Sequence, residues 1–249
     1  MTAPITIDYE TGSIEDRPAY PPKPVGVGIY EPGKKPHYYA FGHPSGNNCT
    51  RDGAIRVLNK ARRSGRPLLF HGSKFDCAVA DEHLGIPYPA YTHTYDTLIE
   101  AFLVDPNARA VSLKPLAEKE LGMPPEEQIE LRDWVWANVP KTKGKKKTWA
   151  AHICKAPGGL VGMYCVGDIV RTRKLHDLYM PQIRAAGMLN AYERELKLSP
   201  ILHQMEKAGI PVATRRLARD VPKFERMLEL VDTWVGRHLG VKDLDVDKG

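Results

Sequence analysis

Cysteine is scarce in this chain of 249 residues, and its cysteines form no paired motif. The four of them, Cys49, Cys77, Cys154 and Cys165, are scattered without a Cys-x-x-Cys pair. Disulfide frameworks and structural zinc sites both need characteristic cysteine spacings, so the sequence supports neither. We interpret the four as reduced thiols that mostly pack in the interior.

Long apolar runs are also missing. No stretch approaches the roughly 20 apolar residues that a helix needs to cross a membrane. Asp8 and Glu10 stand where a signal peptide would have basic and apolar segments. These absences predict a soluble, cytoplasmic protein with no membrane partner. A composition of 42% hydrophobic and 27% charged residues is that of a globular chain long enough to bury a core.

Basic residues outnumber acidic ones, with 36 Lys and Arg against 30 Asp and Glu and a formal net charge of +6. Such a charge would suit an enzyme that cleaves phosphodiesters at acidic residues that bind metal ions. The basic surface would attract a polyanionic substrate that carboxylates without a metal ion would repel. Five lysines fall within residues 141–147. That run is either a solvated loop or a phosphate contact.

Residues 5–11 are predicted to form a strand that carries two acids. Ile5, Ile7 and Tyr9 alternate with polar residues, and residues two apart project from the same face of a strand, so Asp8 and Glu10 point the same way. Adjacent carboxylates raise each other's pKa unless a cation lies between them, and hard divalent cations prefer oxygen ligands. The alternative is an edge strand with solvated acids.

The order of the predicted elements is that of an α/β fold, a ribonuclease H-like mixed β-sheet flanked by helices. The first three strands form an antiparallel meander, and a helix, a strand and a helix follow. Residues 96–103 are a strand end or a helix start, and residues 124–159 are the least regular region. The expected strands are 5–11, 25–30, 37–41 and 67–71. The expected helices are 51–64, 74–83, 113–121, 160–183 and most of the chain from 191 onward, before a linker-like tail at 240–249.

Three motifs resemble those of the DEDD 3′-5′ exonucleases, in the subgroup whose third motif carries tyrosine. They are Asp8-Tyr-Glu10-Thr11, Phe75-Asp76 at a strand-to-helix turn, and Tyr164-x-x-x-Asp168 on a late helix. Each motif lies on the expected element, and three in order are far more specific than one.

Four further segments, residues 96–98, 112–122, 192–196 and 205–212, are similar to the proofreading region of family A DNA polymerases and to the start of the polymerase region. The wording of residues 164–172 looks most like phage enzymes. The similarity implies an exonuclease domain at 1–187 and, at 188–249, a C-terminal helical extension like the start of a polymerase region. It also implies the cytoplasm of a bacterium or of a phage-infected host cell.

The resemblance implies that four carboxylates hold two divalent metal ions, Mg²⁺ or Mn²⁺, and that Tyr164 orients the attacking water. The implied metal ligands, all of them catalytic, are Asp8, Glu10, Asp76 and Asp168. The implied substrate contacts are Tyr9, Thr11, His71 and Phe75. The family usually has Asn where this chain has Gly72, and His71 or Ser73 could replace it. For His71 the alternative is a strand-end histidine satisfied by the backbone.

The implied function is removal of nucleotides from DNA 3′ ends, as in proofreading during replication. The partners would be single-stranded DNA or frayed 3′ ends, and a polymerase region in cis or in trans. Two alternatives stay open: an RNA 3′-end-trimming exonuclease of the same subgroup, and a catalytically weak DNA-binding support domain of a polymerase.

Overall fold

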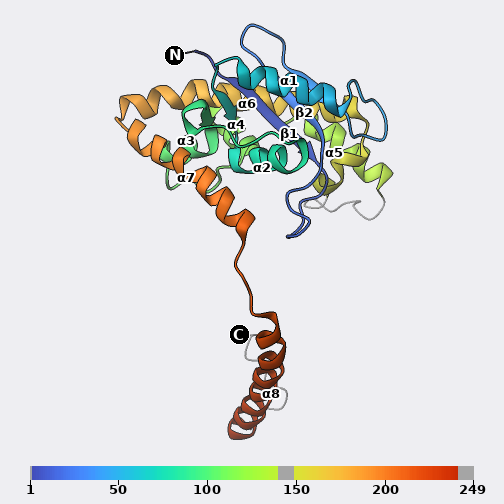
Figure 1. Ribbon diagram of the computed structural model, residues 1–249, viewed down its shortest axis with the longest axis vertical. Coiled ribbons are helices and arrows are strands. Elements are labelled where there is room, and N and C mark those ends of the chain that lie inside the picture. The colour runs from blue at the N-terminus through green and yellow to red at the C-terminus, as the bar shows by residue number, and fades with distance from the viewer. Residues whose placement is uncertain (1, 140–148, 241–249) are drawn as a thin grey trace. The chain divides into compact units, whose positions relative to one another are not determined.

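The computed structural model describes residues 2–139 and 149–240, and Figure 1 follows its elements along the chain. The chain divides into two compact units, residues 1–204 and residues 205–249. The lysine run at 141–147 and nearly all of the predicted tail lie outside the described residues. The functional division at residue 187 stays a prediction.

A five-stranded mixed sheet forms the centre of the first unit. Its spatial order is β3-β2-β1-β4-β5, in which β1, β2 and β3 are antiparallel and β4 and β5 run parallel to β1. The strands are β1 (Ile5–Thr11), β2 (Pro24–Tyr30), β3 (His37–Ala40), β4 (Leu68–Phe70) and β5 (Thr94–Asp96). This is the ribonuclease H-like fold, and the predicted meander is confirmed. The acidic strand is central, so the edge-strand alternative is wrong.

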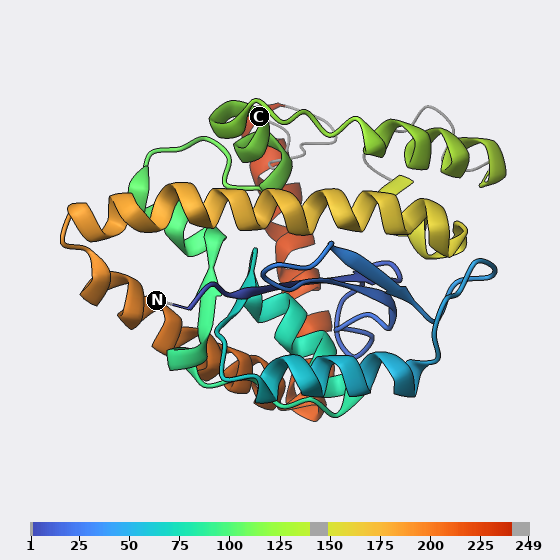
Figure 2. The same ribbon diagram turned by 90° about the horizontal axis from the view of Figure 1, so that it is seen from above.

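Helices cover both faces of the sheet (Figure 2). On one face lies the long helix α6 (Gly158–Ala185), which packs along β1, β2 and β3. On the other lie α1 (Arg51–Arg63) and α2 (Ser73–Leu84). The apolar residues of β1 join the core on the α1 and α2 side. Since strand residues alternate between faces, its two acids are directed toward α6.

Residues 124–159 are more regular than the sequence predicts. They contain α5 (Glu127–Asn138) and the 3₁₀ helix η3 (Trp149–Lys155). In α5, Leu131 and Val135 are fully buried in a cluster with Trp149 and residues of α6. The remaining residues of α5 are largely polar, so this helix depends on tertiary packing rather than on a strong apolar stripe, and the local pattern missed it.

The 3₁₀ helix η1 (Tyr91–His93) leads from α2 into β5. Two short helices, α3 (Thr97–Val104) and α4 (Leu113–Leu121), follow the last strand on the way to α5 and α6. Helix α7 (Leu189–Ala208) follows α6 after a turn at Gly187. In the second unit, α8 (Thr214–Leu239) carries exposed apolar side chains, including Phe224 and Trp234. No helix within the described ranges is both long and apolar enough to cross a membrane.

Candidate active site

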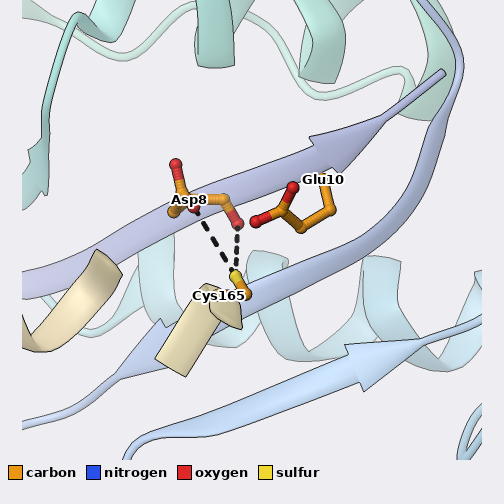
Figure 3. Close-up of side chains that lie close together, drawn as sticks. All are labelled: Asp8, Glu10 and Cys165. Carbon is orange, nitrogen blue, oxygen red and sulfur yellow. Dashed lines mark hydrogen bonds between the residues drawn. The ribbon is translucent and has the colours of Figure 1, made fainter. Parts of the chain in front are cut away.

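Asp8, Glu10 and Cys165 meet where β1 passes under α6. Figure 3 shows the two carboxylates projecting from the strand toward the thiol on the helix. One ligand atom from each of the three lies within 4.8 Å of the others. The thiol of Cys165 donates to Asp8 Oδ2 at 3.6 Å and lies 3.9 Å from its backbone oxygen. A half-buried acid, Asp8, and a buried acid, Glu10, therefore share one site, as their alternation along β1 predicts.

Gly28 allows α6 to approach the sheet this closely. It pairs with Asp8 across β1 and β2, on the same face as the acids. A Cβ atom at this position would lie 2.6 Å from Cys165 Sγ and 3.1 Å from Ile169 Cγ2. Any larger side chain would push the helix away from the two acids.

Asp168 and Tyr164 lie one turn apart on α6, beside Lys114 of α4. Lys114 Nζ donates to Asp168 Oδ2 at 2.6 Å and lies 4.0 Å from the centre of the Tyr164 ring. Trp149 packs edge-on against the same ring, at 6.3 Å between ring centres. The tyrosine and the acid of the third motif are thus held by one shared cation.

Arg171 approaches Asp168 from the other side. Its Nη1 lies 3.5 Å from Asp168 Oδ1, but its hydrogen bonds go elsewhere. It forms a bidentate pair with Glu127, in which Nη2 lies 2.9 Å from Oε2, and Nη2 also donates to the Pro124 carbonyl at 2.9 Å. Bidentate pairing fixes the guanidinium plane, so Arg171 is anchored to α5.

Asp76 reaches the acidic strand from α2. Its Oδ1 accepts a hydrogen bond from the backbone N–H of Tyr9 at 3.2 Å, and the residue is 2% exposed. The charge of Asp8 is the largest electrostatic influence on it after burial, and Glu10 contributes as well. The backbone of β1 thus holds the Asp76 carboxylate beside the acidic strand, and its role as a metal ligand stays a prediction.

Burial raises the pKa of all four acids, and the charges of neighbouring acids raise it further for Asp8, Glu10 and Asp76. Burial, and next the charge of Asp168, raise the pKa of Asp8 to about 7, against a smaller opposing effect of Lys114. For Glu10, burial and then the Asp8 charge raise the pKa well above its usual value. Burial also raises the pKa of Asp168, although Lys114 opposes it. A cation bound at this site would lower these pKa values, because it stabilises the ionised carboxylates.

Two of the four acids, Asp8 and Asp168, open into a cavity of about 520 Å³. Asp8, His71, Lys114 and Asp168 are among the residues that line it. His71 pairs with Thr97 through Nδ1 and Oγ1 at 2.9 Å, and burial lowers its pKa. A backbone hydrogen bond with Val111 also acts on the pKa of His71, so the alternative of a histidine satisfied by the backbone stays open. The lining of the cavity is mixed, because Glu118 and apolar residues accompany Lys114 and His71.

The other predicted substrate contacts are placed differently. Thr11, 7% exposed, donates through Oγ1 to the Gly12 carbonyl at 2.9 Å. Phe75 is half-buried against the core and lies 6.4 Å from the Tyr20 ring, centre to centre. The side chain of Tyr9 is in the hydrophobic core on the α1 and α2 side. Alternation along the strand puts it on the face opposite the acids, so only its backbone reaches the cluster.

Gly72 occupies a turn that favours glycine. Its φ is 89°, in the left-handed region, and its N–H donates to Asp96 Oδ1 at 2.9 Å. Ser73 donates its N–H to Asp96 Oδ2 at 2.7 Å, so one carboxylate fixes the turn before α2. An asparagine here would adopt a less favourable conformation, which gives the departure from the family pattern a local cause.

Three participants escaped the sequence analysis: Lys114, Cys165 and the Arg171–Glu127 pair. Cys165 directly follows Tyr164, and the sequence predicts for it only a packing role in the interior. Glu127 lies in the region expected to be irregular. Lys114 offers the one usable signal, because a lysine in the first turn of a helix opposes the helix dipole and needs a compensating partner.

The residues fit divalent metal ions. Carboxylate oxygen is the ligand that Mg²⁺ and Mn²⁺ prefer, and the cluster supplies it from β1, α2 and α6. Asp168 Oδ1 is buried and takes no hydrogen bond from any described residue. A metal ion would occupy such an oxygen and relieve the repulsion among the acids.

Comparison with known proteins yields no matching family model and no matching curated protein. Solved structures do match. Brucella melitensis NrnC with bound Mg²⁺ is 17% identical, with a TM-score of 0.55 over 83% of this chain and 86% of NrnC. The same NrnC bound to pGG is 16% identical, with a TM-score of 0.56 over 84% and 86%.

The polymerase Pol1 from M. smegmatis, in complex with DNA primer-template and dNTP, also matches. It is 16% identical, with a TM-score of 0.66 over 97% of this chain and 34% of the Pol1 chain. The chain shares the fold of NrnC and of this part of Pol1. Identities this low show a common architecture and leave the chemistry to be argued from the site.

Proposed function

We propose that the chain is a metal-dependent 3′-5′ exonuclease that removes nucleotides from DNA 3′ ends. The observation that carries the proposal is the placement of four acids around β1. Asp8 and Glu10 lie side by side on the strand, Asp168 lines the same cavity as Asp8, and Asp76 accepts a hydrogen bond from the Tyr9 N–H. Proteins bury unpaired like charges at a high cost, so such clusters mark functional sites.

The four carboxylates are the proposed ligands of two Mg²⁺ or Mn²⁺ ions. Bound there, the ions would lower the pKa of the attacking water and offset the charge on the phosphate and on the leaving 3′ oxygen. NrnC, which shares the fold, has been solved with Mg²⁺ bound, and this supports the choice of metal.

Tyr164 is proposed to orient the attacking water together with Glu10. Burial raises the pKa of the Tyr164 phenol despite the opposing charge of Lys114, so the hydroxyl keeps its proton at neutral pH. A protonated phenol donates a hydrogen bond and is no general base. Its contribution is therefore alignment of the water with the scissile bond.

Recognition of the 3′ end is proposed to be independent of sequence. The backbone N–H and hydroxyl of Thr11 would contact the terminal nucleotide, and Phe75 would stack beside a frayed base. His71, which faces the cavity, would replace the missing asparagine at Gly72. We leave the side chain of Tyr9 out of this set because it is part of the core.

A proofreading role is the finer form of the proposal. The match to Pol1 covers 97% of this chain, including its C-terminal helices, and that protein was solved with DNA primer-template. Residues 1–187 would form the exonuclease domain, and residues 188–249 would lead toward a polymerase region in cis or in trans.

Trimming of RNA is the second candidate. The chain covers 86% of NrnC but 34% of Pol1, and NrnC has been solved bound to pGG. The pGG complex of NrnC is the observation that favours this candidate, in which the chain would act on short strands.

A time course separates the two candidates. Single strands of DNA and RNA of one sequence, labelled at the 5′ end, are incubated with the full chain and Mg²⁺, Mn²⁺ or EDTA. The proposal predicts a ladder that shortens from the 3′ end with either metal and stops with EDTA, with DNA degraded faster. Faster loss of RNA would favour the alternative, and a metal-independent ladder would refute both.

A further inference from the structure

Lys114 occupies two positions that are unfavourable for a lysine. It is the second residue of α4, in the turn where the helix dipole is positive, and a cation there costs about 0.3 to 1 kcal/mol. Its side chain is 18% exposed, although lysines are rarely buried without a partner. Both the helix dipole and the loss of solvation are unfavourable for this ammonium, so another interaction in the fold must hold it in place.

The opposing charge comes from the acidic cluster. Asp168 Oδ2 lies 2.6 Å from Lys114 Nζ, and within the described ranges it is the one carboxylate in ion-pair contact with this lysine. The charge of Lys114 also lowers the pKa of Asp8 and Glu10 against their burial. The ammonium therefore stands where positive charge is needed before any metal ion binds.

The two cations beside Asp168 differ in freedom. Glu127 and the Pro124 carbonyl hold the guanidinium of Arg171 through hydrogen bonds, so it is not free to move toward a ligand. Lys114 has three donor protons on a flexible stem, and it also lines the cavity into which Asp8 and Asp168 open. An anion that enters this cavity meets the ammonium next to the acids.

We propose that Lys114 binds the substrate phosphate: its ammonium holds Asp168 and Tyr164 in place in the metal-free site and donates to a non-bridging phosphate oxygen once a metal ion has taken over Asp168. This inference rests on the proposed function and deepens it. The phosphate would then contact the ammonium of Lys114 in addition to the proposed metal ions. It also explains why a lysine is tolerated at the start of α4.

Binding measurements test the role without relying on turnover. Calorimetric titrations of Mn²⁺, and then of the mononucleotide dTMP in the presence of Mn²⁺, are made on wild type, Lys114→Met and Lys114→Arg. For Lys114→Met we expect Mn²⁺ affinity that is unchanged or higher, because a competing cation is gone. We expect dTMP affinity to fall about 10- to 100-fold, the loss of one charge-assisted hydrogen bond. Lys114→Arg should recover part of it.

Lys119→Met is the matched control, since Lys119 is on the same helix, its side chain is 66% exposed and it pairs with Glu120. It should bind Mn²⁺ and dTMP as wild type does, and thermal melts confirm that each variant is folded. Unchanged dTMP affinity in Lys114→Met would overturn the inference, as would parallel loss of Mn²⁺ and dTMP binding, which indicates a structural role. Wild-type protein that binds no Mn²⁺ would instead refute the proposed function, and this inference with it.

Discussion

Asp8 illustrates how one residue links stability to function. It lies beside Glu10 and Cys165, and burial together with the charge of Asp168 raises its pKa to about 7. In the unfolded chain the same carboxyl titrates near ~3.9. Between these two values the folded state holds the proton more tightly, so the free energy of unfolding falls as the pH rises.

Asp8→Asn should therefore stabilise the metal-free protein at high pH. The neutral amide removes the repulsion, and the gain over wild type should be small near pH 4 and reach about 4 kcal/mol at pH 8. Urea unfolding in EDTA across this pH range measures it. With Mn²⁺ the order should reverse, because wild type binds the metal and the variant lacks a ligand. A difference that does not change with pH would contradict the electrostatic account.

Some site residues could be read from the sequence because their arrangement is local. The alternation in β1 predicts that Asp8 and Glu10 share a face, and a spacing of four predicts the same for Tyr164 and Asp168. The contacts of Lys114 are not local: 54 positions separate it from Asp168. Such partners depend on how α4 meets α6, which no local pattern encodes.

At the scale of elements, α6 is the structural centre of the site. This one helix contributes Tyr164, Cys165 and Asp168 and packs along three strands. Its distance from β1 depends on Gly28, where a Cβ atom would lie 2.6 Å from Cys165 Sγ. The distance between the acid of α6 and the acids of β1 is thus set by how the helix packs on the sheet.

Gly28→Ala should destabilise the protein by about 1 to 3 kcal/mol, as overpacking of a core typically does. Cys165→Ala removes the sulfur that the new methyl group would strike. The double variant should lose less than the sum of the single losses, by about 1 kcal/mol, in urea unfolding. Gly159→Ala is the control, because its Cβ would meet no atom within 4 Å. Strict additivity would show that the helix does not rest on this contact.

Elements with a clear period were predictable, and those made by tertiary packing were not. The meander, α1 and α6 follow from alternation, helix spacing and glycine turns. Helix α5 was missed because its burial depends on Leu131 and Val135 meeting Trp149 and α6. Strand β5 has three residues and exists because it pairs with β4.

At the scale of the whole chain, a site built on acids stands in a protein whose formal net charge is +6. This combination favours a polyanionic substrate, since the average field attracts what the bare cluster would repel. The ribonuclease H-like order of elements could be predicted from the sequence. The division into units at 204 and 205 could not, because α7 continues across it without a break.

The most direct test of the central claim is a comparison of wild type and Asp8→Ala on a single-stranded DNA labelled at its 5′ end, with Mg²⁺ present. The account predicts that wild type shortens the strand from its 3′ end and that the folded variant leaves it intact, because a ligand of the proposed metal site is lost. Continued Mg²⁺-dependent trimming by pure Asp8→Ala protein would contradict it.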